Sequence, residues 1–285
     1  MNRLLGKVAV ITGGTRGIGL ALAQAYAAEG ASVFVASRSK DSLEEALSLL
    51  HSAGYQAGGT TTDVADLKQV QALLAAAVRE FGRLDIWVNN AGVAGPYGPT
   101  IQVDPERFLQ VVQTNILGVY YGSMVAAKHF MDQGHGKLIN LLGYGAKGAA
   151  PYQNAYGSSK AWVRRFTQSL ARETRDSGMG VYAFSPGMVL TDLLTNVEVI
   201  QGSEERLKNF PLVLRILAKP PEAVTEKAVW LASSATDGKT GLEVFTASSG
   251  RIMFGALRES MRSLFKQPPT PIELNMKIIP PQNNL

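Results

Sequence analysis

A glycine-rich turn near the start of the chain constrains the fold more than any other segment. It follows a short apolar run from Lys7 to Thr12 and precedes an alanine-rich stretch that begins at Leu20 and ends near Gly30, as a turn between a strand and a helix would. Glycines at such a junction let the backbone approach a diphosphate, to which the helix N-terminus offers free N–H groups. The turn reads Gly13-Gly14-Thr15-Arg16-Gly17-Ile18-Gly19. Its Gly-x-x-x-Gly-x-Gly spacing differs from the usual dinucleotide fingerprint, so a tight turn without a ligand is the alternative.

The alternation of strand and helix continues along the chain. Further strands are expected at 32–37, 56–61, 85–89, 137–142, 181–185 and 242–246, and further helices at 41–53, 66–81, 104–131, 156–176 and 222–232. Crossover helices of this length connect parallel strands, so the sequence predicts an α/β fold with a doubly wound parallel sheet of the Rossmann type, in three layers. No repeat or linker divides it, and we expect one domain over residues 1–250 with an extension over 251–285.

Composition narrows the function classes. The chain has 285 residues, of which 46% are hydrophobic and 18% charged, as expected for one large folded domain. The net charge of +5 comes from scattered Lys and Arg residues, which disfavours nucleic acid and suits an anionic cofactor. The absence of cysteine excludes a thiolate nucleophile or thiolate metal site. The first strand begins almost at Met1 and no apolar run reaches 18 residues, so a cytoplasmic location is expected.

The end of the second predicted strand indicates which dinucleotide would bind. In such folds an acidic residue at this point accepts from the adenosine ribose, whereas an Arg accommodates a 2′-phosphate. Here the sequence is Ser37-Arg38-Ser39-Lys40, without a carboxylate, and Arg16 lies inside the glycine turn. Two guanidinium groups favour NADP(H) over NAD(H). A solvated loop arginine is the alternative for either residue.

Three later segments end at the same edge of the predicted sheet. Asp63 follows the third strand, Asn89-Asn90-Ala91-Gly92 closes the fourth, and Gly143-Tyr144-Gly145 follows the fifth. Ligands of open parallel sheets bind outside the carboxyl ends of the strands. We therefore expect these segments to line a ligand site.

Tyr156 and Lys160 are a candidate proton-transfer pair. Four positions apart on a helix they share one face, so the ammonium can lie beside the phenol. A nearby positive charge favours the phenolate and would lower the pKa of the phenol from its usual value near 10. Such a pair can exchange a proton with a carbonyl or alcohol oxygen. A surface pair without chemical function is the alternative.

Five motifs in order resemble those of the short-chain dehydrogenases/reductases over about residues 5–250. They are Thr12 to Gly19, Asn89-Asn90-Ala91-Gly92, Asn115, Tyr156-x-x-x-Lys160, and Pro186-Gly187-Met188-Val189-Leu190-Thr191. The resemblance implies hydride transfer between a nicotinamide and a carbonyl or alcohol, without a metal.

The same resemblance implies roles for individual residues. Tyr156 would be the general acid, Lys160 would lower the pKa of Tyr156 and bind the nicotinamide ribose, and the Asn115 backbone would hold a relay water. Asp63 would contact adenine, Asn89 the adenosine ribose, and Thr191 the carboxamide. The full set of cofactor contacts expected is Gly13, Thr15, Arg16, Gly17, Ile18, Gly19, Ser37, Arg38, Asp63, Val64, Asn89, Ala91, Gly92, Tyr156, Lys160, Pro186, Gly187, Val189 and Thr191.

One position departs from the family pattern. The family usually carries a Ser thirteen residues before the Tyr, where it would bind the substrate oxygen, and this chain has Gly143. Another donor such as the Tyr144 hydroxyl could replace it, the missing side chain could make room for a bulky substrate, or the chain could bind cofactor without turnover. Gly143 and Tyr144 are accordingly the predicted substrate contacts.

The segments after the Pro186 motif suggest the substrate and the partners. Residues 192–219 match the family's substrate lid, expected to be helical, and their many apolar residues suggest an apolar substrate; an ordinary amphipathic helix pair is the alternative. Residues 251–266 could form a basic amphipathic helix that packs on a neighbour, covers the site or touches a membrane, and 267–285 is proline-rich, extended or poorly ordered. The family suggests a homodimer or homotetramer through the helices at 104–131 and 156–176.

A closer resemblance, to the chlorophyll b reductase branch, is carried by Asp85-Ile86-Trp87-Val88-Asn89, the Gly at 143 and the long tail. The function predicted is an NADPH-dependent reductase of a bulky apolar carbonyl compound. The alternative is a non-catalytic NADP(H)-binding sensor or partner subunit.

Overall fold

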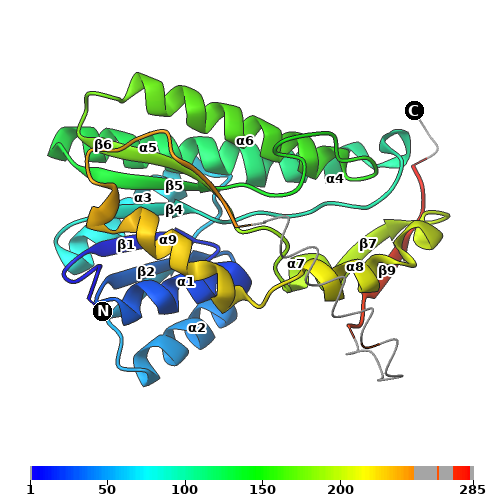
Figure 1. Cartoon of the computed structure of the whole chain (residues 1–285), viewed down its shortest axis with the longest axis horizontal. Coiled ribbons are helices and arrows are strands. Elements are labelled where there is room, and N and C mark those ends of the chain that lie inside the picture. The colour runs from blue at the N-terminus through cyan, green and yellow to red at the C-terminus, as the bar shows by residue number, and fades with distance from the viewer. Residues whose placement is uncertain (1, 247–261, 263–271, 283–285) are drawn as a thin grey trace.

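A parallel β-sheet forms the middle layer of the molecule (Figure 1). The computed structural model describes residues 2–246, 262 and 272–282, and within them the main sheet has seven strands in the order β3-β2-β1-β4-β5-β6-β8. Every neighbouring pair in this sheet is parallel. The strands are β1 (Val8–Thr12), β2 (Ser32–Ser37), β3 (Ala57–Thr61), β4 (Ile86–Asn89), β5 (Gly136–Leu141), β6 (Met179–Ser185) and β8 (Glu243–Phe245). The predicted doubly wound sheet is confirmed.

Helices cover both faces of this sheet. Figure 1 shows α1 (Gly17–Ala28), α2 (Lys40–Ser52) and α9 (Thr225–Ala232) on one side. The other side carries α3 (Leu67–Phe81), α4 (Pro105–Val112), α5 (Gly118–Gln133) and α6 (Asn154–Glu173). Short 3-10 turns occur at Thr100–Gln102, Glu204–Leu207, Pro221–Val224 and Ser234–Thr236. In the part of the chain that is described, no helix is long and apolar enough to cross a membrane.

Local sequence explains why α3 forms and where it ends. The side chain of Asp66 accepts hydrogen bonds from the N–H groups of Lys68 and Gln69, which satisfies donors that the first turn leaves free. Val70, Leu73 and Ala77 recur on one face of the helix and are all buried. Gly82 follows the last turn with a φ of 76°, the left-handed conformation that ends many helices.

The helix predicted over 104–131 is one helical run, but it contains a wide turn. Gln113–Leu117 form a π-helical turn between α4 and α5, in which the N–H of Gly118 donates to the carbonyl of Gln113. Such turns often lie at functional sites. This turn contains Asn115, one of the predicted site residues, whose side chain is completely buried.

The predicted helical lid contains two helices, but it also contains a strand that was not expected. Residues 192–219 contain α7 (Asp192–Thr195), then the strand β7 (Asn196–Ile200), then α8 (Phe210–Leu217). Strand β7 pairs in parallel with β9 (Asn275–Ile279), so part of the proline-rich tail is an ordered strand. The partner of β7 lies more than seventy residues away, beyond the reach of a local pattern. The predicted basic helix over 251–266 falls outside the described residues, apart from Arg262.

Candidate functional site

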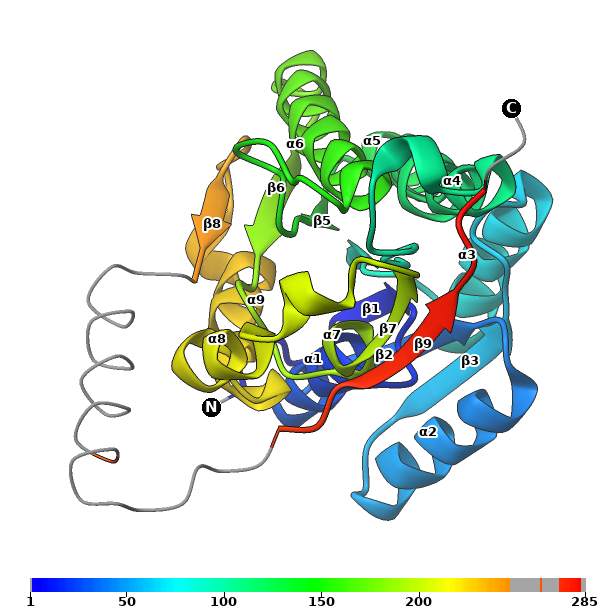
Figure 2. The same cartoon turned by 90° about the vertical axis from the view of Figure 1, so that its right-hand side faces the viewer.

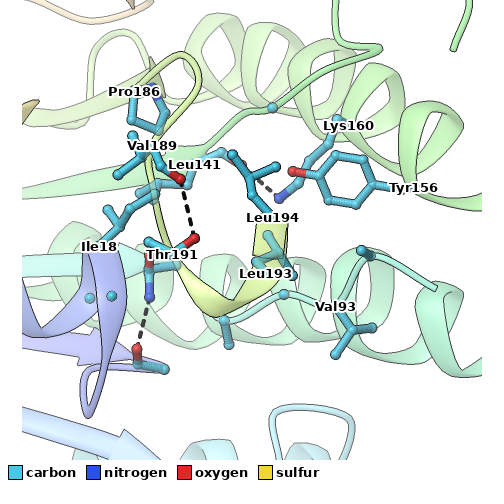
Figure 3. Close-up of a pocket in the computed structure, with 18 of the residues that line it drawn as sticks. Ile18, Val93, Leu141, Tyr156, Lys160, Pro186, Val189, Thr191, Leu193 and Leu194 are labelled. Atoms are coloured by element: carbon cyan, nitrogen blue, oxygen red, sulfur yellow. Dashed lines mark hydrogen bonds between the residues drawn. The ribbon is translucent and has the colours of Figure 1, made fainter. Parts of the chain in front are cut away.

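A cavity of about 1190 Å³ opens at the carboxyl ends of the sheet strands. Its wall combines the glycine turn, the loops after β2, β3, β4, β5 and β6, and the lid. All the predicted site residues line it except Asn89 and Asn115. Figure 3 shows Tyr156 and Lys160 entering the cavity from α6, with Thr191, Leu193 and Leu194 at the start of the lid.

The glycine turn leaves backbone exposed to this cavity. A Cβ on Gly19 would collide with the Gly13 carbonyl and with the Asn90 amide, so only glycine permits this close approach. Asn90 donates to the carbonyls of Thr12 and Gly13 at 2.9 Å each, which holds the turn in place. Helix α1 begins here without a side-chain cap. Its first N–H groups and its dipole can therefore serve an anionic ligand such as a diphosphate.

Two arginines line the cavity, one directly after β2 and one in the glycine turn. Arg38 is exposed and lies beside the serines at 37, 39 and 42 in the wall. Arg16 lies in the glycine turn, and its guanidinium is 3.5 Å from the Asp192 carboxylate of the lid, a pair in which both side chains are exposed. No carboxylate follows β2 directly. Guanidinium groups can donate two parallel hydrogen bonds to a phosphate.

Burial, rather than the neighbouring charge, dominates the pKa of Tyr156. The Lys160 ammonium lies 5.6 Å from the centre of the Tyr156 ring and donates to the Leu141 carbonyl at 3.1 Å. Burial raises the pKa of Tyr156 to about 12 and lowers the pKa of Lys160 to about 8. The expected lowering of the Tyr156 pKa is therefore not found in this structure, because burial disfavours the phenolate and raises the pKa.

The space at Gly143 is occupied by Tyr156 itself. A Cβ at residue 143 would lie closer than any real Cβ contact to the Tyr156 hydroxyl, and only 3.0 Å from Cζ of the same ring. The absent side chain therefore leaves room for the phenol, not for a substrate. Tyr144, the predicted replacement donor, lines the cavity but is 61% exposed.

Asn115 acts behind the cavity wall. Its amide accepts from the Val93 N–H at 2.9 Å and donates to the Val93 carbonyl and to the Ser159 hydroxyl. Ser159 in turn donates to the Tyr156 carbonyl at 2.7 Å. The π-helical turn is thus tied to the loop after β4 and to the helix that carries Tyr156.

The structure also corrects the position of Asn89. Its side chain is buried below the cavity, where it accepts from the Trp87 indole N–H at 2.8 Å and donates to Ser123 and to Asn140. The neighbouring Asn90 lines the cavity instead. A run of two asparagines at a strand end does not reveal which one faces the ligand until the strand register is known.

Several wall residues were not predicted from the sequence. Lys147 lies over the Phe245 ring at 3.5 Å, and Glu198 reaches the cavity from β7. Lys147 could have been found from its place four residues after Gly143, in the loop that follows β5. No local sequence pattern indicates that Glu198 faces the cavity, because it lies on β7 and a helix was predicted for the lid.

Comparison with known proteins places this fold and site in a family. The short chain dehydrogenase family model matches residues 7–200. The chain is 35% identical over 244 residues to 3beta-hydroxysteroid dehydrogenase 1 of Eggerthella lenta, which covers 85% of this chain and 92% of that protein. It is also 35% identical over 246 residues to the Oryza sativa subsp. japonica protein named "Probable chlorophyll(ide) b reductase NYC1, chloroplastic", covering 77% of this chain but 46% of that protein.

Solved structures agree with these relatives. The 3-ketoacyl-(acyl-carrier-protein) reductase from Brucella melitensis, complexed with NADH, is 30% identical with a TM-score of 0.76 and covers 85% of this chain and 97% of its own. Actinorhodin polyketide ketoreductase with NADPH is 31% identical with a TM-score of 0.73, over 84% of this chain and 95% of its own. The chain belongs to the short-chain dehydrogenase/reductase family, and it is an oxidoreductase that acts on a carbonyl or alcohol group with a nicotinamide cofactor.

Proposed function

We propose that this chain is an NADPH-dependent reductase of a bulky apolar aldehyde or ketone, with Tyr156 as general acid. The observation that carries the proposal is the presence of Tyr156, Lys160, the glycine turn and Arg38 in the wall of one cavity. A bound nicotinamide would supply a hydride to the carbonyl carbon. The chain's own part is to hold the ring, exclude water and deliver a proton to the carbonyl oxygen.

Tyr156 supplies that proton in the proposed mechanism. Because burial raises the pKa of its hydroxyl to about 12, the hydroxyl is protonated at neutral pH and can donate to the substrate oxygen. The product is an alcohol, and the phenolate that remains is stabilised by the Lys160 ammonium. Asn115 keeps this pair in position through Ser159.

The preference for NADP(H) rests on Arg16 and Arg38. Both line the cavity, and no carboxylate directly follows β2 to accept from a ribose hydroxyl. The solved relatives carry NADH in one case and NADPH in the other, so these residues and not the family support the choice.

The apolar substrate is supported by the lid. Leu193 and Leu194 of α7 and Ile216 and Leu217 of α8 line the cavity. The relative named as a chlorophyll(ide) b reductase offers one example of a large flat substrate class. A bulky carbonyl compound with little charge would bury its surface against these side chains.

Consumption of NADPH with a panel of bulky aldehydes and ketones tests the proposal. We expect wild-type protein to oxidise NADPH with at least one of them, and Tyr156→Phe to lose this activity while still binding NADPH. Tyr55→Phe is the matched control, because Tyr55 lies just before β3 and does not line the cavity. Activity that survives in Tyr156→Phe would exclude the proposed acid. Tight NADPH binding without turnover of any compound would favour the sensor function instead.

Three other expectations stay predictions. Sedimentation analysis tests the homodimer or homotetramer, and cell fractionation tests the cytoplasmic location. Flotation with anionic vesicles tests whether the segment over 251–266 binds a membrane surface.

A further inference from the structure

The lid strand reaches beyond the Tyr156 end of the cavity. Glu198 of β7 lines the main cavity and also a side pocket of about 260 Å³, whose wall includes Arg38, Asp63 and Arg107. Arg38 and Asp63 follow β2 and β3, on the opposite half of the sheet from β5 and β6. Figure 2 looks onto this edge and shows β7 and β9 side by side in front of the ends of β1 and β2.

Strand β7 is held in this position from both sides. On one side the Tyr97 N–H donates to the Glu198 carbonyl at 2.8 Å, and the Ile200 N–H donates to the Tyr97 carbonyl at 2.9 Å. On the other side β9 pairs with β7 from Asn196↔Asn275 to Ile200↔Ile279. After β9 the chain reaches the 3-10 turn Thr100–Gln102, where the Gln282 N–H donates to the Gln102 carbonyl at 3.0 Å.

Two cations fix the Glu198 side chain over the side pocket. Arg107 of α4 donates to one carboxylate oxygen at 3.2 Å, and Lys277 of β9 donates to the other at 3.1 Å. The Glu198 side chain is 27% exposed, whereas Lys277 is 69% exposed. The carboxylate therefore links the lid strand, the tail strand and helix α4 at one point.

We propose that the tail strand β9 is part of the cofactor site: it fastens β7 over the adenosine half of the cavity and slows release of the dinucleotide. Lys277 and Arg107 are positioning residues that act through Glu198. The family model ends at residue 200, so β9 lies beyond the part of the chain that the model describes. The inference rests on the proposed function, because it assumes that Arg38 marks the adenosine end.

Two neighbouring isoleucines give a matched pair of variants. The Ile279 carbonyl accepts from the Gln201 N–H at 2.9 Å, so the backbone groups of Ile279 face β7. Those of Ile278 point away from β7, because N–H and C=O directions alternate along a strand. Ile279→Pro therefore removes a ladder hydrogen bond, whereas Ile278→Pro removes none. Lys277→Met tests the ion pair, with Lys208→Met as its control in the exposed lid pair Lys208–Glu205.

The measurements are dissociation constants for NADP+, for adenosine 2′,5′-bisphosphate and for nicotinamide mononucleotide, together with the NADPH dissociation rate. For Ile279→Pro we expect about fivefold weaker binding of the adenosine fragment and about fivefold faster release of NADPH. For Lys277→Met we expect about twofold to threefold changes of the same kind. The dissociation constant for the mononucleotide should stay within about twofold of the wild-type value in every variant. In the control variants Ile278→Pro and Lys208→Met, all of these quantities should stay within about twofold of the wild-type values.

The outcomes separate this inference from the proposed function. If the wild type binds NADP+ and Ile279→Pro binds the adenosine fragment as tightly as the wild type does, the role of β9 is overturned but the cofactor assignment stands. An equal loss for both fragments would also overturn the role of β9, because it would indicate general unfolding. Wild-type protein that binds neither NADP+ nor the adenosine fragment would overturn the cofactor assignment together with it.

Discussion

Adding a side chain at Gly143 should move the Tyr156 phenol and little else. A Cβ at this position would lie 3.0 Å from Cζ of the ring and 3.3 Å from Cγ of Lys160, and closer still to the hydroxyl oxygen. Carbon atoms in favourable contact lie about 3.5–4.0 Å apart, so the ring must move by roughly 0.5–1 Å. The hydroxyl is the far end of a side chain that faces an open cavity, and it can give way without a change of backbone.

The expected consequence is a loss of rate rather than of stability. A displacement of about 1 Å in a reacting group can cost on the order of a hundredfold in rate. We therefore expect kcat of Gly143→Ala and Gly143→Ser to fall by about that factor, with NADPH affinity within about twofold of wild type. Thermal unfolding should change by no more than a few degrees, as for a shift of about 1 kcal/mol or less.

NADPH oxidation with the best carbonyl substrate measures this effect. Gly148→Ala is the matched control, because it lies in the same loop and a Cβ there meets no atom within 4 Å. Gly143→Ser restores the residue type that the family usually carries, so it also tests the opposite view, that the missing hydroxyl limits the rate. Activity of Gly143→Ser at or above the wild-type level would refute the steric reasoning.

Three further predictions follow from charge and burial. Arg38→Ala should weaken NADPH binding by about tenfold or more and NADH binding much less, and calorimetry measures both dissociation constants. If the ratio of the two dissociation constants is the same in the variant as in the wild type, Arg38 does not contact the phosphate. Because burial lowers the pKa of Lys160 from its usual 10.5 to about 8, the unfolded chain holds a proton between these values that the folded chain has lost. The unfolding free energy of the wild type relative to that of Lys160→Met should thus rise between pH 8 and 10.5, by up to about 3 kcal/mol. Urea titrations in which the difference between the two proteins stays constant over this pH range would contradict the prediction. Asn89→Ala leaves the buried Trp87 indole N–H without its acceptor and removes one donor from the Asn140 amide oxygen, so it should cost about 2–4 kcal/mol in urea unfolding while NADP+ affinity stays within about twofold. A large loss of NADP+ affinity with unchanged stability would instead support a direct contact between Asn89 and the cofactor.

The parts of the fold that could be predicted from the sequence are those encoded by neighbouring residues. Strand β1 is buried at every position and reads as a continuous apolar run, as strands covered on both faces do. The glycine turn combines a strand, a helix start and positive φ values at Gly13 and Gly17, all within a dozen residues. Since the edge at which parallel strands end follows from topology, the loops after β3, β4 and β5 could be assigned to the ligand site without coordinates, and the family resemblance supplied the individual contacts.

The predictions that differ from the structure concern residues whose partners lie far away in the sequence. Residues Asn196–Ile200 have the β-branched alternation of a strand, but an isolated strand of five residues is not stable, and its partners Tyr97 and β9 lie far away in the sequence. Asn89 was misplaced for a similar reason, because its partners Ser123 and Asn140 lie on α5 and β5. Neither position can be derived from the local pattern.

The chemistry of Tyr156 shows a further limit, since spacing identifies the neighbour of a group but not its degree of burial. Four positions along a helix place an ammonium beside a phenol, which favours the phenolate; burial opposes ionisation, and in this structure it is the larger effect. A phenol with a pKa of about 12 is ionised in roughly one molecule in 100,000 at pH 7, so Tyr156 would meet an incoming carbonyl with its proton in place. Lys160, with a pKa of about 8, also keeps its proton in most molecules at that pH. Both partners are therefore in the state that reduction needs, which agrees with the role of general acid expected for Tyr156, although the expected lowering of its pKa is not found.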